Sequence, residues 1–301
     1  MAAYRYEKID AFTARGSLGN PAACLFLRNG QNLSNEKMQE IATAHKGFVS
    51  EVVYCREIDR NMYSLRYFSS ECEVDFCGHG TIACMYSLIN GSPILRNMDT
   101  VTIQIKNATL PVYNRILTEN AVYVAAPEPA YHDILLSESR ISAVLGIDPG
   151  TLDAAYPVSL INSGLNTLIV PVADLKTEVS MFPDEPALKA FCVNYSIDIV
   201  LTWCFSVQDN RHFAHTRVFA AIFGYLEDPA TGSGNSAFGY YLLQNKLWGG
   251  DSIVIEQGGR DRVYNTIRLT CQNGRVLFGG GATTRIRGEY FLEGGRAPNG
   301  D

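Results

Sequence analysis

Two stretches of this chain predict helices that are apolar on every side. Residues 76–95 contain no Asp, Glu, Lys or Arg, although 19% of the whole chain is charged. No charged residue falls between Asp228 and Lys246 either. A helix without a polar face has no side to turn toward water, so other structure must enclose it. We therefore predict two buried helices, one after the segment Cys77-Gly78-His79-Gly80 and one over residues 235–243.

Both predicted helices follow a glycine-rich segment, and their starts are separated by about half the length of the chain. An internal duplication of this kind indicates an α+β protein of two similar lobes, each built around one helix. Alternating apolar and polar residues predict strands that outnumber about four helices, and Ser34 is the expected N-cap of a helix over residues 35–44. We assign residues 1–121 to an N-terminal lobe, completed by residues 282–301, and residues 122–281 to a C-terminal lobe.

Charge and cysteine usage exclude several classes of partner. The net charge of -6 and the pI near 5.4 argue against binding to nucleic acid or to an anionic membrane. No apolar run reaches the roughly 18 residues that span a bilayer, and the N-terminus lacks the pattern of a secretory signal. The eight cysteines include no C-x-x-C pair, and most lie in apolar segments. We expect a cytoplasmic protein with reduced thiols.

Candidate chemistry gathers before the first buried helix. Glu51 lies among valines in a predicted strand, where it is either a solvent-facing carboxylate or a general base. Cys77 at a helix start is either a thiolate of lowered pKa or a small buried apolar residue. His79 either orients a substrate and shares a proton or only makes hydrogen bonds at the helix start. Gly78 and Gly80 permit close approach to the backbone, which favours function.

The segment before the second buried helix has a similar design. Asp228 precedes a proline, so its backbone is biased toward an extended conformation. Its carboxylate either faces a ligand in front of the helix or caps the helix. Residues 231–234, Thr-Gly-Ser-Gly, offer backbone N–H groups suited to a carboxylate. The segment lacks the Lys-Ser/Thr pair of a phosphate-binding loop and the spacing of a dinucleotide site, so the sequence gives little support to a nucleotide cofactor.

Two segments, FSSECEVDFCGHGTIA and LEDPATGSGNSA, resemble the signature segments of the phenazine-biosynthesis PhzF-like family, which has the diaminopimelate-epimerase-like fold. The similarity continues in DAFT…GNPAAC, SEVV, SGLNTLIVPV and IEQG, and it spans nearly the whole chain in order. The resemblance implies that each lobe is a barrel-like, mostly antiparallel sheet around a central helix, with the active site in the cleft between lobes. It also implies an enzyme without a cofactor or metal that forms a homodimer.

The resemblance also assigns site residues. The catalytic residues are Glu51, His79 and Asp228, and the substrate-binding residues are Asn20, Cys77, Gly78, Gly80, Thr231, Gly232, Ser233, Gly234, Gln257 and Gly258. The chain departs from the family pattern at Gly80, where Ala or Pro is usual, and over residues 261–265, where a Met-Gly-Arg-Pro-Ser run is usual.

The hypothesis is a cofactor-independent isomerase that moves a proton within a small carboxylate-bearing substrate, with Glu51 as the base. Two alternatives stay open. One is an epimerase or racemase of an amino or hydroxy acid that uses Cys77. Relatives of this kind use two opposed cysteines, but no cysteine lies between Cys204 and Cys271, and Asp228 occupies the second position. The other alternative is a non-catalytic protein that binds a small ligand on the same fold.

Overall fold

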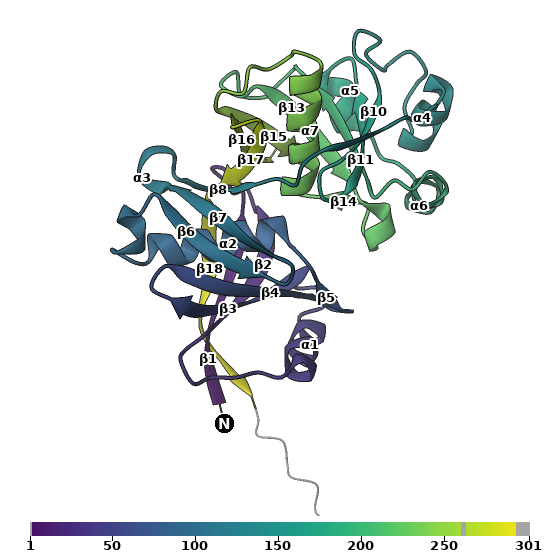
Figure 1. The fold of residues 1–301 in the computed structure, drawn as a ribbon. Coiled ribbons are helices and arrows are strands. Elements are labelled where there is room, and N and C mark those ends of the chain that lie inside the picture. Colours follow the sequence, from purple (N-terminus) through teal and green to yellow (C-terminus); the bar gives the residue numbers. More distant parts are fainter. Residues whose placement is uncertain (1, 260–262, 293–301) are drawn as a thin grey trace, which may run out of the picture. The chain divides into compact units, whose positions relative to one another are not determined.

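The computed structural model describes residues 2–259 and 263–292, and Figure 1 shows their fold. These residues form two compact units. Unit 1 comprises residues 2–11, 21–122 and 282–292, and unit 2 comprises residues 12–20, 123–259 and 263–281. Residues 261 and 262, in the segment where the sequence departs from the family pattern, lie outside the described residues.

The first lobe does not run unbroken from residue 1 to 121 as predicted, because residues 12–20 belong to unit 2. The backbone N–H of Phe12 donates to the carbonyl of Gly281, and its own carbonyl accepts from Thr266. The N–H of Gly19 donates to the side-chain oxygen of Asn265. The turn between the first two strands is therefore held by residues some 250 positions later in the chain.

The sheet of unit 1 is built mainly from antiparallel pairs, with parallel pairing of β2 to β3 and of β4 to β6. Helix α2 (Gly78–Asn90) packs against β1, β3 and β18 of this sheet, and its residues 80–87 are all buried. The strands are, in spatial order, β18 (Ala282–Leu292), β1 (Ala2–Ala11), β2 (Asn20–Leu27), β3 (Glu51–Asp59), β4 (Met62–Ser69), β6 (Thr100–Ile105) and β7 (Ala108–Arg115), and β5 (Glu73–Val74) pairs with β4.

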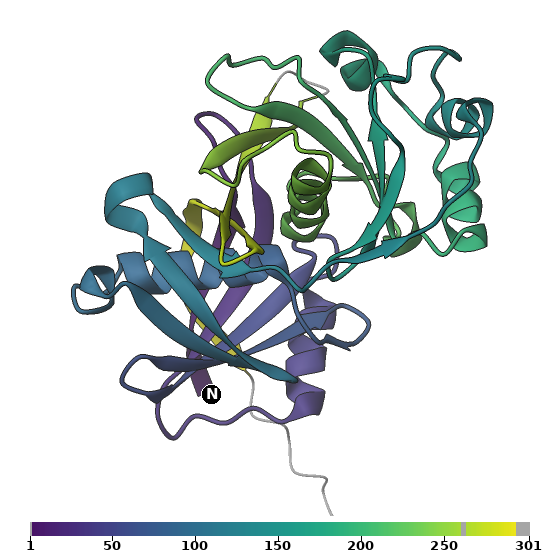
Figure 2. The same cartoon turned by 45° about the horizontal axis from the view of Figure 1, so that its top comes forward.

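The sheet of unit 2 repeats this design around helix α7 (Gly232–Gln244), which contacts β10, β11, β12, β16 and β17. Figure 2 looks nearly along α7 and shows these strands curving around it. In spatial order the strands are β9 (Ala130–His132), β10 (Ser159–Asn162), β11 (Asn166–Pro171), β12 (Ile199–Cys204), β13 (Ala214–Phe219), β15 (Ile253–Gly258), β16 (Tyr264–Gln272) and β17 (Arg275–Gly280). The short β14 (Glu227–Asp228) pairs with β13, and β8 (Ala121–Ala125) pairs with β17.

The remaining helices are short. Helix α1 (Asn35–Ala44) begins after Ser34, whose hydroxyl accepts from the N–H of Lys37, as the sequence predicts. The others are α3 (Ile116–Glu119), α4 (Glu138–Leu145), α5 (Leu175–Ser180), α6 (Glu185–Asn194), and the 3₁₀ turns η1 (Leu95–Asn97) and η2 (Ala221–Phe223). A side chain caps the N-terminus of α1, α4, α5 and α6. The sequence analysis missed α3 and α5 because helices of one or two turns leave little periodic pattern.

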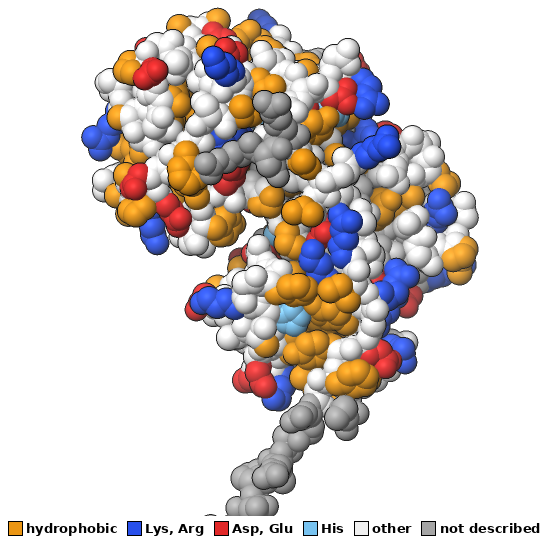
Figure 3. Space-filling model, turned by 180° about the vertical axis from the view of Figure 1, so that it is seen from behind, with side chains coloured by type: hydrophobic (Ala, Val, Ile, Leu, Met, Phe, Trp, Pro, Cys, Tyr) orange, Lys and Arg blue, Asp and Glu red, His pale blue; other side chains and the backbone are white. Residues whose placement is uncertain are grey.

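On the face that Figure 3 shows, Lys and Arg side chains are scattered among acidic and hydrophobic ones. Within residues 2–259 and 263–292, every helix is too short or too polar to cross a bilayer.

Candidate active site

Three predicted residues of unit 1 meet where strand β3 and helix α2 begin. Glu51 is the first residue of β3 and pairs across the sheet with Ser69, at the end of β4. From there the chain runs through β5 to Cys77, the N-cap of α2, and His79 follows in the first turn. The antiparallel pairing of β3 with β4 thus brings the helix start back to Glu51, 26 positions away in sequence.

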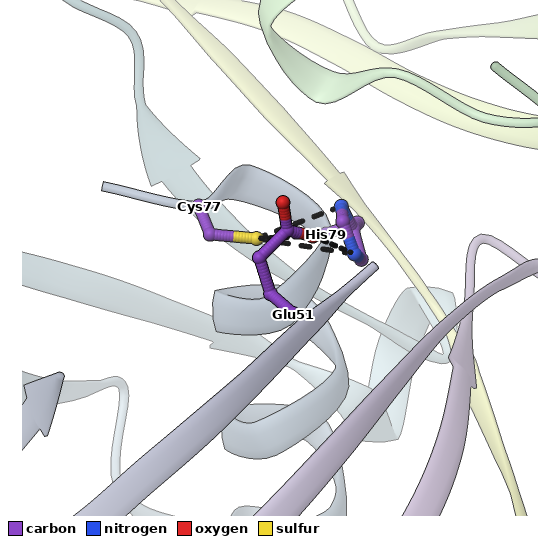
Figure 4. A group of neighbouring side chains, drawn as sticks. All are labelled: Glu51, Cys77 and His79. Carbon is purple, nitrogen blue, oxygen red and sulfur yellow. Dashed lines mark hydrogen bonds and ion pairs between the residues drawn. The ribbon is translucent and has the colours of Figure 1, made fainter. Parts of the chain in front are cut away.

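Figure 4 shows these three side chains pointing toward one another. His79 Nε2 lies 3.2 Å from Glu51 Oε2. Cys77 Sγ lies 3.8 Å from the same carboxylate oxygen and 3.6 Å from His79 Nδ1. The His79 side chain is 13% exposed and that of Glu51 21%, so the group is mostly desolvated but still open on one side. We call these three residues the acid–base cluster.

The neighbours within the acid–base cluster set its protonation. Burial alone would lower the pKa of His79, but Cys77 and the Glu51 carboxylate raise it well above its usual range. Burial raises the pKa of the Cys77 thiol, and the charge of Glu51 acts in the same direction, while His79 opposes both. Of the two interpretations of Cys77, a thiolate of lowered pKa or a small buried residue, the raised pKa of its buried thiol favours the second.

The start of α2 explains the unusual glycine at position 80. The N–H of Gly80 donates to Cys77 Sγ over 3.3 Å, so this predicted substrate-binding amide serves as part of the helix cap. A β-carbon at Gly80 would lie 2.9 Å from Val53 Cγ2 and 3.0 Å from Cys77 Sγ. The N–H groups of Gly78 and His79 have no acceptor among the described residues, so two amides at the positive end of the helix stay available.

In unit 2, Asp228 lies at the end of β14, just before α7. Its carboxylate accepts hydrogen bonds from Asn20 Nδ2 and from Thr231 Oγ1, both over 2.7 Å. The N-cap of α7 is Thr231, so Asp228 holds the capping residue and is not itself the cap. Asn20 is almost fully buried and also donates to the carbonyl of Ala230 over 2.9 Å. Asn20 and Asp228, two predicted site residues, thus form one hydrogen-bonded pair.

Gln257 is fully buried beneath this pair and makes four hydrogen bonds within unit 2. Its Oε1 accepts from the Thr231 N–H over 2.9 Å and from Asn235 Nδ2 over 2.7 Å. Its Nε2 donates to the carbonyl of Asp228 over 2.8 Å and to Thr231 Oγ1 over 3.1 Å. These contacts give Gln257 a positioning role at the start of α7, and direct contact with a substrate stays a prediction.

The first turn of α7 has backbone N–H groups without an acceptor among the described residues, which suits the binding of an anion. The N–H groups of Gly232, Ser233 and Gly234 find no acceptor in the part of the chain that the structure describes, although both glycines are buried. Buried N–H groups normally have a partner, and a helix N-terminus attracts negative charge. Glycine is required at position 232, since a β-carbon there would lie 2.5 Å from Phe278 Cε2. Gly258 adopts a left-handed φ of 91° at the end of β15.

Residues 9–288 match the family model described as phenazine biosynthesis-like protein, PhzC-PhzF. The chain belongs to the PhzC-PhzF family. It is 27% identical over 303 residues to antisense-enhancing sequence 1 of Schizosaccharomyces pombe, covering 97% of this chain and 100% of that protein. It is also 27% identical over 255 residues to the uncharacterized isomerase YfhB of Bacillus subtilis, covering 83% of this chain and 85% of that protein.

The predicted fold is confirmed by a solved structure. The crystal structure of a phenazine biosynthesis protein of the PhzF family from Bacillus anthracis superposes with a TM-score of 0.84 at 24% identity, covering 97% of this chain and 100% of that one. This PhzC-PhzF chain therefore has the α+β fold expected from its sequence, with two similar lobes built around central helices.

Several residues that position the PhzC-PhzF site are absent from the prediction. Arg217 is fully buried, and its Nε and Nη2 donate to the carboxylate of Glu227, each over 2.8 Å. This pairing fixes β14 and hence Asp228. Asn265 donates from Nδ2 to the carbonyl of Pro229 over 2.7 Å. Arg217 stands in an apolar strand, and a buried arginine requires a carboxylate partner, so this signal was present in the sequence. Nothing in the local sequence marks Asn265.

Proposed function

We propose that this protein is an isomerase that moves a proton within a small carboxylate-bearing substrate without a cofactor. The observation that carries the proposal is the contact between Glu51 Oε2 and His79 Nε2 in a half-open, mostly desolvated group. A carboxylate and an imidazole in such a position are typical of general acid–base catalysis. Family membership and relatives named isomerases point to the same reaction class.

Each side chain of the acid–base cluster receives one role. Glu51 removes a proton from a carbon next to an activating group and returns it to another carbon. His79, whose pKa is raised by its neighbours Cys77 and Glu51, donates a hydrogen bond to a polar substituent and stabilises the negative charge that develops. Cys77 caps α2 and contacts both partners, which fixes the helix start on which His79 stands.

The start of α7 supplies the binding part of the proposal. Backbone N–H groups of Gly232, Ser233 and Gly234 bind a carboxylate, because they lie at a helix N-terminus and have no acceptor among the described residues. Asp228, aligned by Asn20, holds a polar substituent of the substrate, which is the role that the resemblance implies. A cytoplasmic location and a homodimer stay predictions of the sequence.

The substitution Glu51→Gln tests the proposal. The protein is incubated in ²H₂O with a panel of small amino and hydroxy acids, and mass spectrometry measures deuterium incorporation. With Glu51→Gln we expect incorporation to fall by a factor of about 10² to 10⁴, the usual contribution of a general base. Glu57→Gln, on the exposed end of the same strand, is the matched control and keeps the wild-type rate. Undiminished exchange in Glu51→Gln would remove Glu51 from the mechanism, and no exchange with any compound would favour the ligand-binding alternative.

A further inference from the structure

The acid–base cluster also has the donor set of a zinc site. We propose that Glu51, Cys77 and His79 bind one Zn²⁺ ion and that this binding inhibits the proton transfer. An imidazole nitrogen, a sulfur and a carboxylate oxygen are the ligands that Zn²⁺ takes in proteins. Their donor atoms all lie within 4.8 Å of one another, and no other group of His, Cys, Asp or Glu within residues 2–259 and 263–292 converges in this way.

The distances between the donor atoms fit one ion. Zinc bonds of about 2.0 Å to nitrogen or oxygen and about 2.3 Å to sulfur hold the donors roughly 3.3 to 3.5 Å apart at tetrahedral angles. His79 Nε2 and Glu51 Oε2 are 3.2 Å apart. Cys77 Sγ lies 3.8 Å from Glu51 Oε2 and 3.9 Å from His79 Nε2. Small side-chain rotations therefore close the site without any movement of the backbone.

The backbone around the acid–base cluster is suited to hold a metal. Glu51 begins a strand, and Cys77 and His79 belong to the first turn of a buried helix, so regular elements position all three ligands. The partial exposure of His79 and Glu51 gives an ion a way in. Three protein ligands leave the fourth tetrahedral position for water.

A second group of the same residue types lies in unit 2 and serves as an internal comparison. Glu178 Oε2 accepts from Cys204 Sγ over 3.2 Å and lies 2.9 Å from His215 Nδ1. We call these three residues the buried cluster. The side chains of Glu178 and His215 have no exposed surface, and Cys204 is buried as well. An ion has no open path to this cluster, so we expect zinc binding at the acid–base cluster alone.

Zinc at the acid–base cluster would stop the proposed proton transfer. The inhibition, unlike the zinc binding itself, rests on the proposed function. Cys77 binds as the thiolate and His79 as the neutral imidazole, so the protons of the thiol and of the imidazole nitrogen that binds the metal pass to the buffer when Zn²⁺ arrives. The carboxylate oxygen of Glu51 that contacts His79 becomes a metal ligand and can no longer accept a proton from carbon. Substrate and Zn²⁺ then compete for the free protein.

Calorimetry with Zn²⁺ tests binding without any assay of activity. The full chain, freed of metal with a chelator, carries Cys72→Ser and Cys271→Ser so that its more accessible thiols are absent. We expect one Zn²⁺ per chain, and Co²⁺ at the same site to show the thiolate charge-transfer absorption of a sulfur-bound ion. Cys77→Ala or His79→Ala weakens binding by more than the roughly 10- to 100-fold that follows from loss of an outer-sphere partner.

Controls separate this site from unspecific binding. Cys204→Ala changes the buried cluster and should leave Zn²⁺ affinity unchanged. Circular dichroism confirms that each variant is folded, and Cys77→Ser replaces Cys77→Ala should the latter fail to fold. Absence of Zn²⁺ binding, or an affinity unchanged by both Cys77→Ala and His79→Ala, overturns the proposal. Deuterium exchange that persists with Zn²⁺ bound overturns the inhibition. A protein that binds Zn²⁺ but exchanges no deuterium in metal-free form leaves the site standing and refutes the proposed function.

Discussion

Units 1 and 2 each contain a glutamate, a histidine and a cysteine in contact, but the two groups differ in their surroundings. In the acid–base cluster, His79 and Glu51 are partly exposed and lie 3.2 Å apart at the start of a helix. In the buried cluster, the Glu178–His215 pair is fully enclosed at 2.9 Å. The carboxylate there also accepts from Thr202 Oγ1 over 3.0 Å.

The comparison shows that environment, more than residue type, separates chemistry from structure. The buried cluster uses both carboxylate oxygens of Glu178 for donors inside the protein, and the side chains of Glu178 and His215 have no exposed surface through which a ligand could reach them. In the acid–base cluster, the side chains of Glu51 and His79 are partly exposed, so a substrate can reach them and form hydrogen bonds with them. A catalytic group requires such access. Removing a carboxylate should therefore damage stability in one unit and activity in the other.

The largest expected effect is a loss of stability in Glu178→Gln. Removal of one partner from a buried ion pair costs about 3 to 5 kcal/mol, because the other charge stays buried without compensation. The same substitution at Glu51 should cost less than that, since the Glu51–His79 pair keeps part of its contact with solvent. Urea unfolding of both variants, followed by circular dichroism, measures the two costs. Equal losses would show that the two clusters have the same structural role.

A smaller effect concerns the pH dependence of stability. Burial alone would lower the pKa of His215, but Glu178 outweighs it and raises the pKa above the usual value of about 6.5. Between the unfolded and the folded pKa, the native state binds more protons than the unfolded one. The contribution of His215 is therefore complete below about pH 6.5 and falls by at most about 1.4 kcal/mol per pH unit as pH rises toward the folded pKa.

Urea midpoints measured from pH 6 to pH 9 test this expectation. The difference between the wild type and His215→Gln should shrink as pH rises, with His132→Gln at an exposed position as the matched control. A difference that is constant over this range would show that His215 does not hold an extra proton in the folded state, and the buried cluster would then lack its ion pair.

The two buried helices show most clearly what could be predicted from the sequence. Their lack of charge predicted α2 and α7, because an apolar helix can only be enclosed. Glu51 and His79 could be singled out because they stand in or beside unusual segments. The buried cluster could not be predicted, since its members are ordinary residues that the pairing of β12 with β13 and the packing of α5 against both strands bring together. The transfer of residues 12–20 to unit 2 escaped prediction for the same reason.

The hydrogen-bond network of Gln257 and Asn235 at the start of α7 is another feature that the sequence predicts only in part. Gln257 belonged to the predicted site, but the residue type alone does not show whether its side chain binds a substrate or other residues. In the structure its side chain forms hydrogen bonds with Thr231, Asn235 and the carbonyl of Asp228. Asn235 was not among the predicted site residues, although it is fully buried at the helix start. A polar residue in an apolar helix was the available signal, since such a residue needs a partner.

The smallest expected effect is that of Cys77→Ser, which tests the thiol-based alternative. Serine is a good N-cap and can accept from the Gly80 N–H as the sulfur does, so stability should change by less than about 1 kcal/mol. Burial keeps the Cys77 thiol protonated, and α7 begins at Thr231, so a pair of opposed thiolates has no second member there. Deuterium exchange in Cys77→Ser should therefore stay within about tenfold of wild type, far from the loss expected for Glu51→Gln. Exchange abolished in Cys77→Ser and retained in Glu51→Gln would reverse the assignment, because sulfur would then be the atom that carries the proton.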